Sequence, residues 1–158
     1  MTDEAKKEFT LRISQANKSQ MVVIIYEILL EHLQDAQAAV LAGDKESKRE
    51  SINKIRGCIN ELIGSLHYEY EPAGELLELY VYCSKELVNA DLHDSEASLQ
   101  HIEQVITSLK EAYAVVAEQD NSPAVMGNTQ AVYAGLTYGK NTLTENVSDP
   151  SGNRGFLA

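Results

Sequence analysis

The chain has 158 residues, of which 44% are hydrophobic and 23% are charged, a composition typical of one globular domain with its own core. The formal net charge of −11 argues against nucleic acid as a partner, because phosphate binding requires a basic face. It also argues against anionic lipid, and no run approaches the ~18 consecutive apolar residues of a membrane span. No signal peptide is visible, so we expect a cytoplasmic protein without membrane insertion.

Residues 1–16 are mostly polar and carry three apolar positions, Phe9, Leu11 and Ile13. Leu11 and Ile13 alternate, which is compatible with an extended arm lying along a groove. A freely solvated arm is the alternative interpretation. Either way, we expect this segment to be an arm separate from the helical part of the chain.

Residues 17–42 are predicted to form a long helix. Asn17 is a favourable N-cap with Gln20 in the capping-box position, and Gly43 is a typical residue just after a helix. Residues 21–30 are apolar around most of the helix, whereas a helix in a small bundle needs a stripe only about 100° wide. This excess of apolar residues has two interpretations. Either the helix is buried on several sides or partly covered by the arm, or it forms a groove for another chain.

Three further helices are predicted from apolar residues that recur every three or four positions. The predicted limits are 44 or 45 to 67–70, just after Pro72 to 90–93, and an N-cap at Asp94 or Ser95 to 118–121. Four long helices with short connections favour antiparallel neighbours. The sequence therefore predicts an all-α, antiparallel up-down four-helix bundle over residues 17–121.

Residues 122–158 differ from the rest, since they contain five of the nine glycines and two of the three prolines. We expect a non-helical tail, extended or disordered, that is either solvated or docked. Its apolar residues are Val132, Tyr133, Leu136, Tyr138, Phe156 and Leu157. One hypothesis is that residues 133–156 dock on the bundle and compete with a bound partner. The predicted division is therefore arm 1–16, bundle 17–121 and tail 122–158.

No catalytic or metal-binding pattern is visible. None of the four histidines follows an acidic residue by three positions, so the Glu-x-x-His pairs of di-iron bundles are missing. Cys58 and Cys83 lie within apolar helical patterns, which favours packing in the core over redox or nucleophilic roles. We expect a protein that is not an enzyme and uses no metal or cofactor.

The tyrosines divide between core and surface. Tyr80 and Tyr113 fit the apolar stripes of their helices. Tyr82 stands two residues from Tyr80 and cannot share its face. Because tyrosine is enriched at interfaces, Tyr82 is interpreted either as a boundary residue or as part of a recognition surface.

Four segments of the sequence are distinctive when their order and spacing are taken together. They are Ala16-Asn17-Lys18 before Met21–Tyr26, Glu61–Leu66, Leu79–Tyr82 before Leu87–Ala90, and Ala112-Tyr113. In this arrangement the chain resembles the FliS family of flagellin-specific export chaperones, over about residues 9–118. The family usually has a tyrosine in its amino-terminal arm, where this chain has Phe9. The tail lies outside the resemblance.

The resemblance implies a cytoplasmic bundle that binds the disordered carboxy-terminal segment of flagellin along its apolar grooves. It also implies that this binding prevents premature polymerisation and delivers flagellin to the export gate of the flagellar type III apparatus. A displaceable arm and an over-apolar first helix fit helix-in-groove binding. The residues expected to bind the partner are Phe9, Leu11, Ile13, Val22, Ile25, Tyr26, Leu29, Leu66, Leu79 and Tyr82.

A second hypothesis explains the same apolar excess without a flagellar client. In this alternative the chain is a helical oligomerisation or adaptor module that pairs through its apolar surface. A sedimentation experiment separates the two hypotheses, because a monomer at all concentrations excludes self-pairing.

Overall fold

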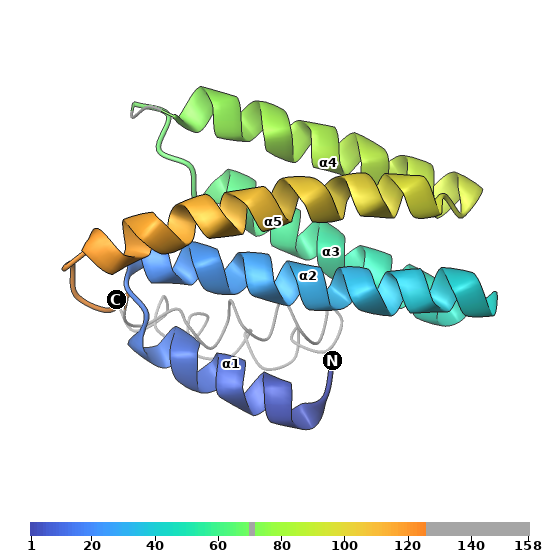
Figure 1. Ribbon diagram of the computed structural model, residues 1–158, viewed down its shortest axis with the longest axis horizontal. Coiled ribbons are helices and arrows are strands. Elements are labelled where there is room, and N and C mark those ends of the chain that lie inside the picture. The colour runs from blue at the N-terminus through green and yellow to red at the C-terminus, as the bar shows by residue number, and fades with distance from the viewer. Residues whose placement is uncertain (70–71, 126–158) are drawn as a thin grey trace, which may run out of the picture.

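The computed structural model describes residues 1–69 and 72–125, and within these ranges it contains five α-helices (Figure 1). They are α1 (Asp3–Gln15), α2 (Lys18–Ala42), α3 (Lys45–Gly64), α4 (Ala73–His93) and α5 (Glu96–Gln119). In the described part of the chain no helix is long and apolar enough to cross a membrane.

Local side-chain chemistry sets the limits of α2, as predicted. The Asn17 side chain accepts from the backbone N–H of Gln20 at 2.9 Å, and the Gln20 side chain accepts from the backbone N–H of Asn17 at 3.0 Å. This reciprocal capping box satisfies two N–H groups that the helix itself leaves unpaired. At the other end, Gly43 adopts the left-handed conformation with φ +68° and ends the helix.

The limits of the other bundle helices also follow their predicted signals. Asp44 caps α3 by accepting from Ser47, and Ser95 caps α5 by accepting from Ser98. Helix α4 begins directly after Pro72. Helix α3 ends at Gly64, a few residues before the predicted limit at 67–70. These agreements are expected, because caps and proline act through neighbouring residues.

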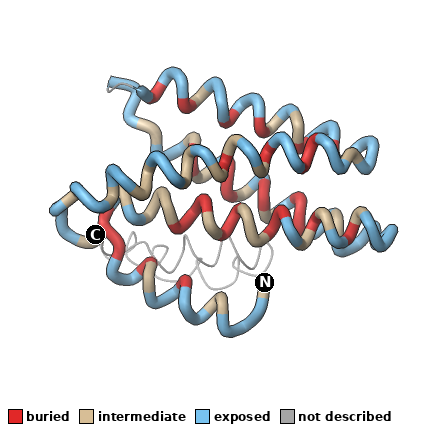
Figure 2. The backbone as a smooth tube through the Cα atoms, viewed as in Figure 1, coloured by how far each residue is buried: buried red, intermediate tan, exposed pale blue. Residues whose placement is uncertain are grey.

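Helices α2 to α5 form the predicted four-helix bundle. α2 packs beside α3 and α5, and α4 packs beside the same two helices, so the four make a square with antiparallel neighbours (Figure 1). The buried residues lie on the facing sides of the helices (Figure 2). The side chains at the centre include Ile28, Leu29, Ile55, Cys58, Cys83, Leu99 and Ile102, each with no measurable exposure. The core placement of both cysteines is thereby confirmed.

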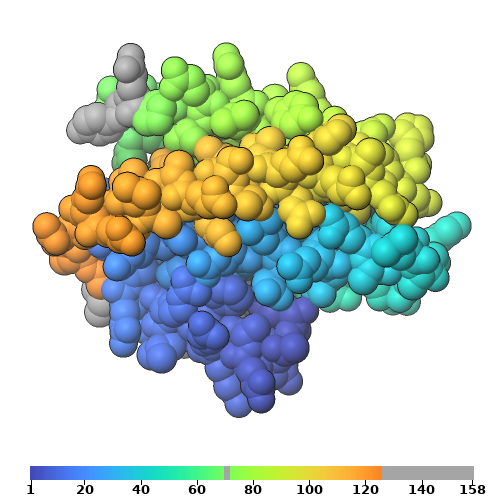
Figure 3. Space-filling model, viewed as in Figure 1, coloured from blue at the N-terminus to red at the C-terminus, as the bar shows by residue number. Residues whose placement is uncertain are grey.

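The amino-terminal segment corrects the expectation of an extended or solvated arm. Residues 3–15 form α1, which packs against the outer side of α2 (Figure 3). Thr2 caps the helix by accepting from Ala5, and Phe9 and Ile13 are buried at positions i and i+4. This spacing puts both side chains on one face of a helix, so docking on α2 favours helix over an extended arm.

Only the first four residues of the predicted tail, Ser122 to Val125, belong to the described part of the chain. The expected apolar residues Val132, Tyr133, Leu136, Tyr138, Phe156 and Leu157 lie outside it. The extended or disordered character of residues 126–158, and their docking on the bundle, therefore stay predictions.

Candidate functional site

An apolar pocket of about 480 Å³ opens at the end of the bundle where α2 and α4 begin and α3 ends. We call it the end pocket. Helix α3 stops at Gly64 and α4 begins at Ala73, and of the chain between them Ser65, Leu66, His67 and Pro72 line one side of the space. The apolar side chains that line it are Met21, Val22, Ile25, Leu66, Leu76 and Val125.

Three tyrosines lie at the inner side of the end pocket. Tyr80 and Tyr113 line the pocket, and Tyr26 lies behind them with no exposed surface. The hydroxyl oxygens of Tyr26 and Tyr80 are 2.5 Å apart, and the Tyr26 and Tyr113 rings meet edge to face at 5.7 Å. Burial raises the pKa of Tyr26 and Tyr113, and raises that of Tyr80 to about 12. All three hydroxyls therefore stay protonated at neutral pH.

The rim of the end pocket is polar. Lys18 is on α2, Glu61 is on the neighbouring helix α3, and His67 follows on the connection after α3. An apolar floor with a few polar groups at its edge is the usual arrangement of a site that binds an amphipathic segment.

A second hollow, of about 450 Å³, lies between α1, α2 and α5. It is lined by Arg12, Gln15, Ala16, Gln20, Val23, Ile24, Ala114, Ala117 and Glu118. The Arg12 guanidinium forms an ion pair with Glu27 of α2 at 2.5 Å and lies 5.6 Å from the centre of the Phe9 ring. Its hydrogen bond to Glu27 raises the pKa of Arg12. Arg12 thus joins α1 to α2 at the edge of this hollow.

The ten residues predicted to bind a partner lie in several separate parts of the structure. Val22, Ile25 and Leu66 line the end pocket, and Tyr26 lies directly behind it. Leu79 and Tyr82 are on the surface of α4, with 37% and 41% of their area exposed. The remaining four lie elsewhere. On α1, Phe9 and Ile13 are buried where the helix packs against α2, and Leu11 is exposed. Leu29 of α2 is fully buried in the core.

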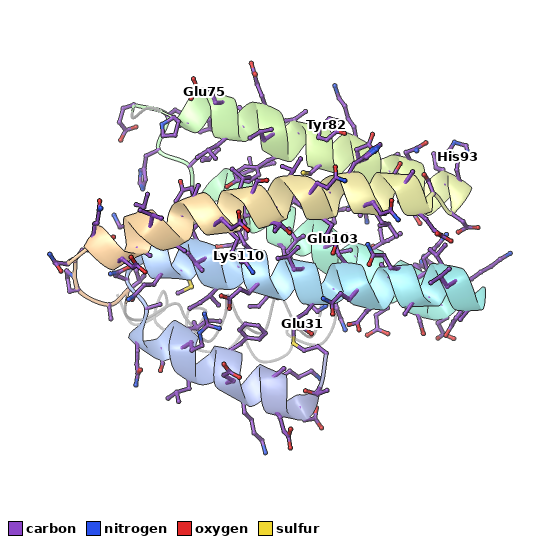
Figure 4. All side chains as sticks on the ribbon, in the orientation of Figure 1. Glu31, Glu75, Tyr82, His93, Glu103 and Lys110 are labelled. Atoms are coloured by element: carbon purple, nitrogen blue, oxygen red, sulfur yellow. The ribbon has the colours of Figure 1, made fainter. Side chains whose placement is uncertain are left out.

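Tyr82 lies on the side of α4 that carries polar residues. Glu75 and His93 stand seven positions before it and eleven after it, which puts all three on one stripe of the helix (Figure 4). Leu79 is next to this stripe. Leu79 and Tyr82 thus form a small exposed patch among polar side chains and do not line the end pocket.

Sequence reasoning missed several residues of the end pocket. Met21 and Leu76 belong to the predicted apolar stripes, so periodicity identified them as buried without indicating a cavity. Tyr113 and Val125 reach the pocket from the far end of the chain, and only the packing of α5 beside α2 brings them there. Such a long-range placement leaves no local signal in the sequence.

Both cysteines, Cys58 and Cys83, are free thiols buried in the bundle. Burial raises the pKa of Cys58 and raises that of Cys83 to about 12, whereas a nucleophilic cysteine requires a lowered pKa. Among the described residues, no group of three or more His, Cys, Asp or Glu side chains is arranged to hold a metal ion. The apolar end pocket is therefore the candidate binding site.

Comparison with known proteins agrees with this structure. The family model described as flagellar protein FliS matches residues 1–120, which include all five helices. The flagellar secretion chaperone FliS of Bacillus subtilis (strain 168) is 24% identical to this chain over 101 residues, covering 64% of this chain and 76% of that protein. Because the family model matches residues 1–120 of the 158, the chain is a member of the FliS family of flagellar proteins.

Proposed function

We propose that this protein is a flagellar secretion chaperone that binds the carboxy-terminal segment of flagellin in the cytoplasm. Binding covers the apolar surface of the client, prevents premature polymerisation, and keeps the subunit available for the flagellar type III export apparatus. Family membership supports the flagellar assignment, and the relative named above is a secretion chaperone.

The single observation that carries the proposal is the end pocket. A folded monomer would normally fill such a space with its own side chains, because protein interiors are close-packed. Here Val22 and Leu66 line an open apolar space of about 480 Å³ at the end of the bundle. An amphipathic client helix can place its apolar anchors there and its polar side toward the rim.

The net charge of −11 fits the same role. A strongly charged surface keeps a protein soluble while it presents exposed apolar residues. In this proposal, ordering of the client on the bundle offsets part of the interaction energy, and the apolar area buried produces a negative heat-capacity change.

Calorimetric titration with the carboxy-terminal segment of flagellin from the same cell tests the proposal. We expect 1:1 binding with a negative heat-capacity change. Val22→Asp and Leu66→Asp, at partly buried positions of the pocket wall, are expected to weaken binding by at least about tenfold, which equals ~1.4 kcal/mol. Leu41→Asp is the matched control, because Leu41 is 74% exposed near the other end of α2.

Two results would contradict the proposal in different ways. If the unsubstituted protein does not bind the flagellin segment while its helical spectrum is intact, the chaperone assignment fails. If Val22→Asp and Leu66→Asp are well folded and bind as tightly as the unsubstituted protein, the client binds elsewhere and the assignment of the pocket fails.

A second candidate function is an oligomerisation or adaptor module, and one observation favours it. Val81, Val88 and Leu92 are 39%, 51% and 71% exposed and lie on one stripe of α4, at spacings of seven and four. Such a stripe can pair with another copy. A sedimentation coefficient that rises with concentration in the unsubstituted protein, and not in Val88→Asp, would support this candidate.

A further inference from the structure

The chain that follows α5 does not leave the bundle directly. The Asn17 side-chain amide donates to the carbonyl of Asp120 at 3.0 Å, and the Ser19 hydroxyl donates to the Asp120 carboxylate at 2.5 Å. Five residues later, the N–H of Val125 donates to the carbonyl of Ala16 at 2.8 Å. These three hydrogen bonds hold residues 120–125 against the junction between α1 and α2.

This course brings the chain to the end pocket. Val125 is one of the residues that line the pocket, and it is partly buried. The last residue before the segment outside the description, Val125, therefore lies at the pocket wall. The match to the family model ends at residue 120, so this approach to the pocket is made by residues beyond the matched region.

The sequence directly after Val125 is suited to burial. No charged residue occurs between Asp120 and Lys140, in a chain of which 23% is charged. Burying this run requires no charge to be desolvated, which would be costly in an apolar pocket. Within it, residues 131–138 read AVYAGLTY and carry two tyrosines, one valine and one leucine.

We propose that residues 131–138 occupy the end pocket when no client is bound, so that the chain carries an intramolecular competitor for its own client site. Tyr133 and Leu136 are the anchors, and the aromatic wall formed by Tyr80 and Tyr113 receives them. This inference rests on the proposed function for the identity of the client, but the docking itself does not.

The length of the intervening chain permits this docking. Residue 132 is seven positions beyond Val125, and a chain of that length reaches ~23–25 Å when extended. Closing so short a loop costs little entropy, and a short tether produces an effective concentration of the order of millimolar. Weak contacts are therefore sufficient to fill the pocket. A client must displace the segment, which lowers its apparent affinity in proportion to the occupied fraction.

Methyl NMR of the full chain tests the docking without any client. The reporters are the methyl groups of Met21 and Leu66, which lie on different walls of the pocket. In the full chain with Tyr133→Asp and Leu136→Asp, we expect both signals to shift and the shift to be independent of protein concentration. The matched control is the chain with Leu143→Asp and Val147→Asp, which adds the same two negative charges to the tail outside residues 131–138.

Three results would overturn the inference. The first is unchanged Met21 and Leu66 signals in the doubly substituted chain. The second is an equal shift in the control chain with Leu143→Asp and Val147→Asp. The third is a shift that appears only as concentration rises, because a second copy of the chain would then be the occupant.

Calorimetry with the flagellin segment separates this inference from the proposed function. We expect the doubly substituted chain to bind the client roughly threefold more tightly or better, as release of an occupied site requires. Shifted methyl signals without any client binding would support docking and contradict the chaperone assignment. Client binding with unchanged affinity and unshifted signals would support the chaperone assignment and contradict docking.

Discussion

The hydroxyl oxygens of Tyr26 and Tyr80 lie 2.5 Å apart, although the two residues are 54 positions apart in the chain. Both side chains are buried, with 0% and 1% of their area exposed. Because burial keeps both hydroxyls protonated at neutral pH, one of them donates to the other. The pair joins α2 to α4 behind the end pocket.

We expect Tyr26→Phe to destabilise the protein by ~1–3 kcal/mol, since it leaves the Tyr80 hydroxyl buried without this partner. Adding Tyr80→Phe should cost much less than Tyr80→Phe alone, because the double substitution removes both polar groups. Urea unfolding of the four proteins in a double-mutant cycle measures the coupling. Strictly additive free energies of unfolding would show that the pair contributes no interaction of its own.

Docking of α1 depends on its buried face and not on its exposed one. Ile13→Ala removes a side chain that is 1% exposed, whereas Leu11→Ala on the same helix removes one that is 60% exposed. We expect Ile13→Ala to increase hydrogen exchange of the α1 amides while α3 and α4 keep their protection. A helix of this length is marginal without docking.

Leu11→Ala is the control for this experiment and should leave the exchange pattern unchanged. Equal exchange in the two variants would mean that α1 is held by its polar contacts, such as the ion pair between Arg12 and Glu27. Exchange that rises throughout the bundle in Ile13→Ala would mean that α1 folds as one unit with the other helices.

The lowered pKa of Asp120 predicts that the stability of the protein changes in acid. Hydrogen bonds from Ser122 and Ser19 lower the pKa of its carboxyl to about 2, below the usual ~3.9 of an unfolded aspartate. A lowered folded-state pKa contributes stability that is present above about pH 4 and is lost as the pH falls through about 2. The difference in urea midpoint between the unsubstituted protein and Asp120→Asn should therefore shrink between pH 5 and pH 2.

The comparison with Asp120→Asn isolates this group from the other acidic residues, which titrate in both proteins. Ser19→Ala should reduce the same pH-dependent difference, because it removes one of the donors. A midpoint difference that stays constant from pH 5 to pH 2 would contradict the assignment of the low pKa to Asp120.

Gly43 and Gly74 are expected to respond oppositely to alanine. A Cβ at either position meets no atom within 4 Å, so steric contact does not distinguish them. Gly43 has φ +68°, where an alanine costs ~1–2 kcal/mol. Gly74 lies in the first turn of α4 without a positive φ, and Gly74→Ala should stabilise the protein by ~0.4–1 kcal/mol through the unfolded chain.

Thermal or urea unfolding of both variants measures this contrast. Gly43→Asn should recover part of the loss, because asparagine tolerates the left-handed conformation better than alanine. A Gly43→Ala variant as stable as the unsubstituted protein would mean that the end of α2 rearranges to avoid the strain.

The bundle was predictable from sequence because its signals are local. Asn17, Gly43, Pro72 and Ser95 act on backbone groups within four residues, and the apolar stripes repeat with the period of the helix. The cysteine positions followed from the same stripes. No long-range contact was needed to identify the four helices or their antiparallel order.

α1 was mispredicted although its sequence contains a signal. Phe9, Ile13 and Ala16 follow each other by four and three positions, and Thr2 stands as an N-cap before an acidic first turn. The prediction of an extended arm rested instead on the alternation of Leu11 and Ile13, which spans only three residues. Since a helix of this length is marginal alone, its formation depends on the surface of α2 that it covers.

The end pocket, too, was predictable from the sequence only in part. By itself, the sequence determined that Val22, Ile25 and Leu66 are apolar positions of helices and that residues 121–139 carry no charge. Only the tertiary structure brought Tyr113 and Val125 to the beginning of α2 and left a cavity between them. Periodicity indicates which side of a helix is apolar. A cavity depends on how far apart the ends of the packed helices lie, and no interaction between neighbouring residues determines that separation.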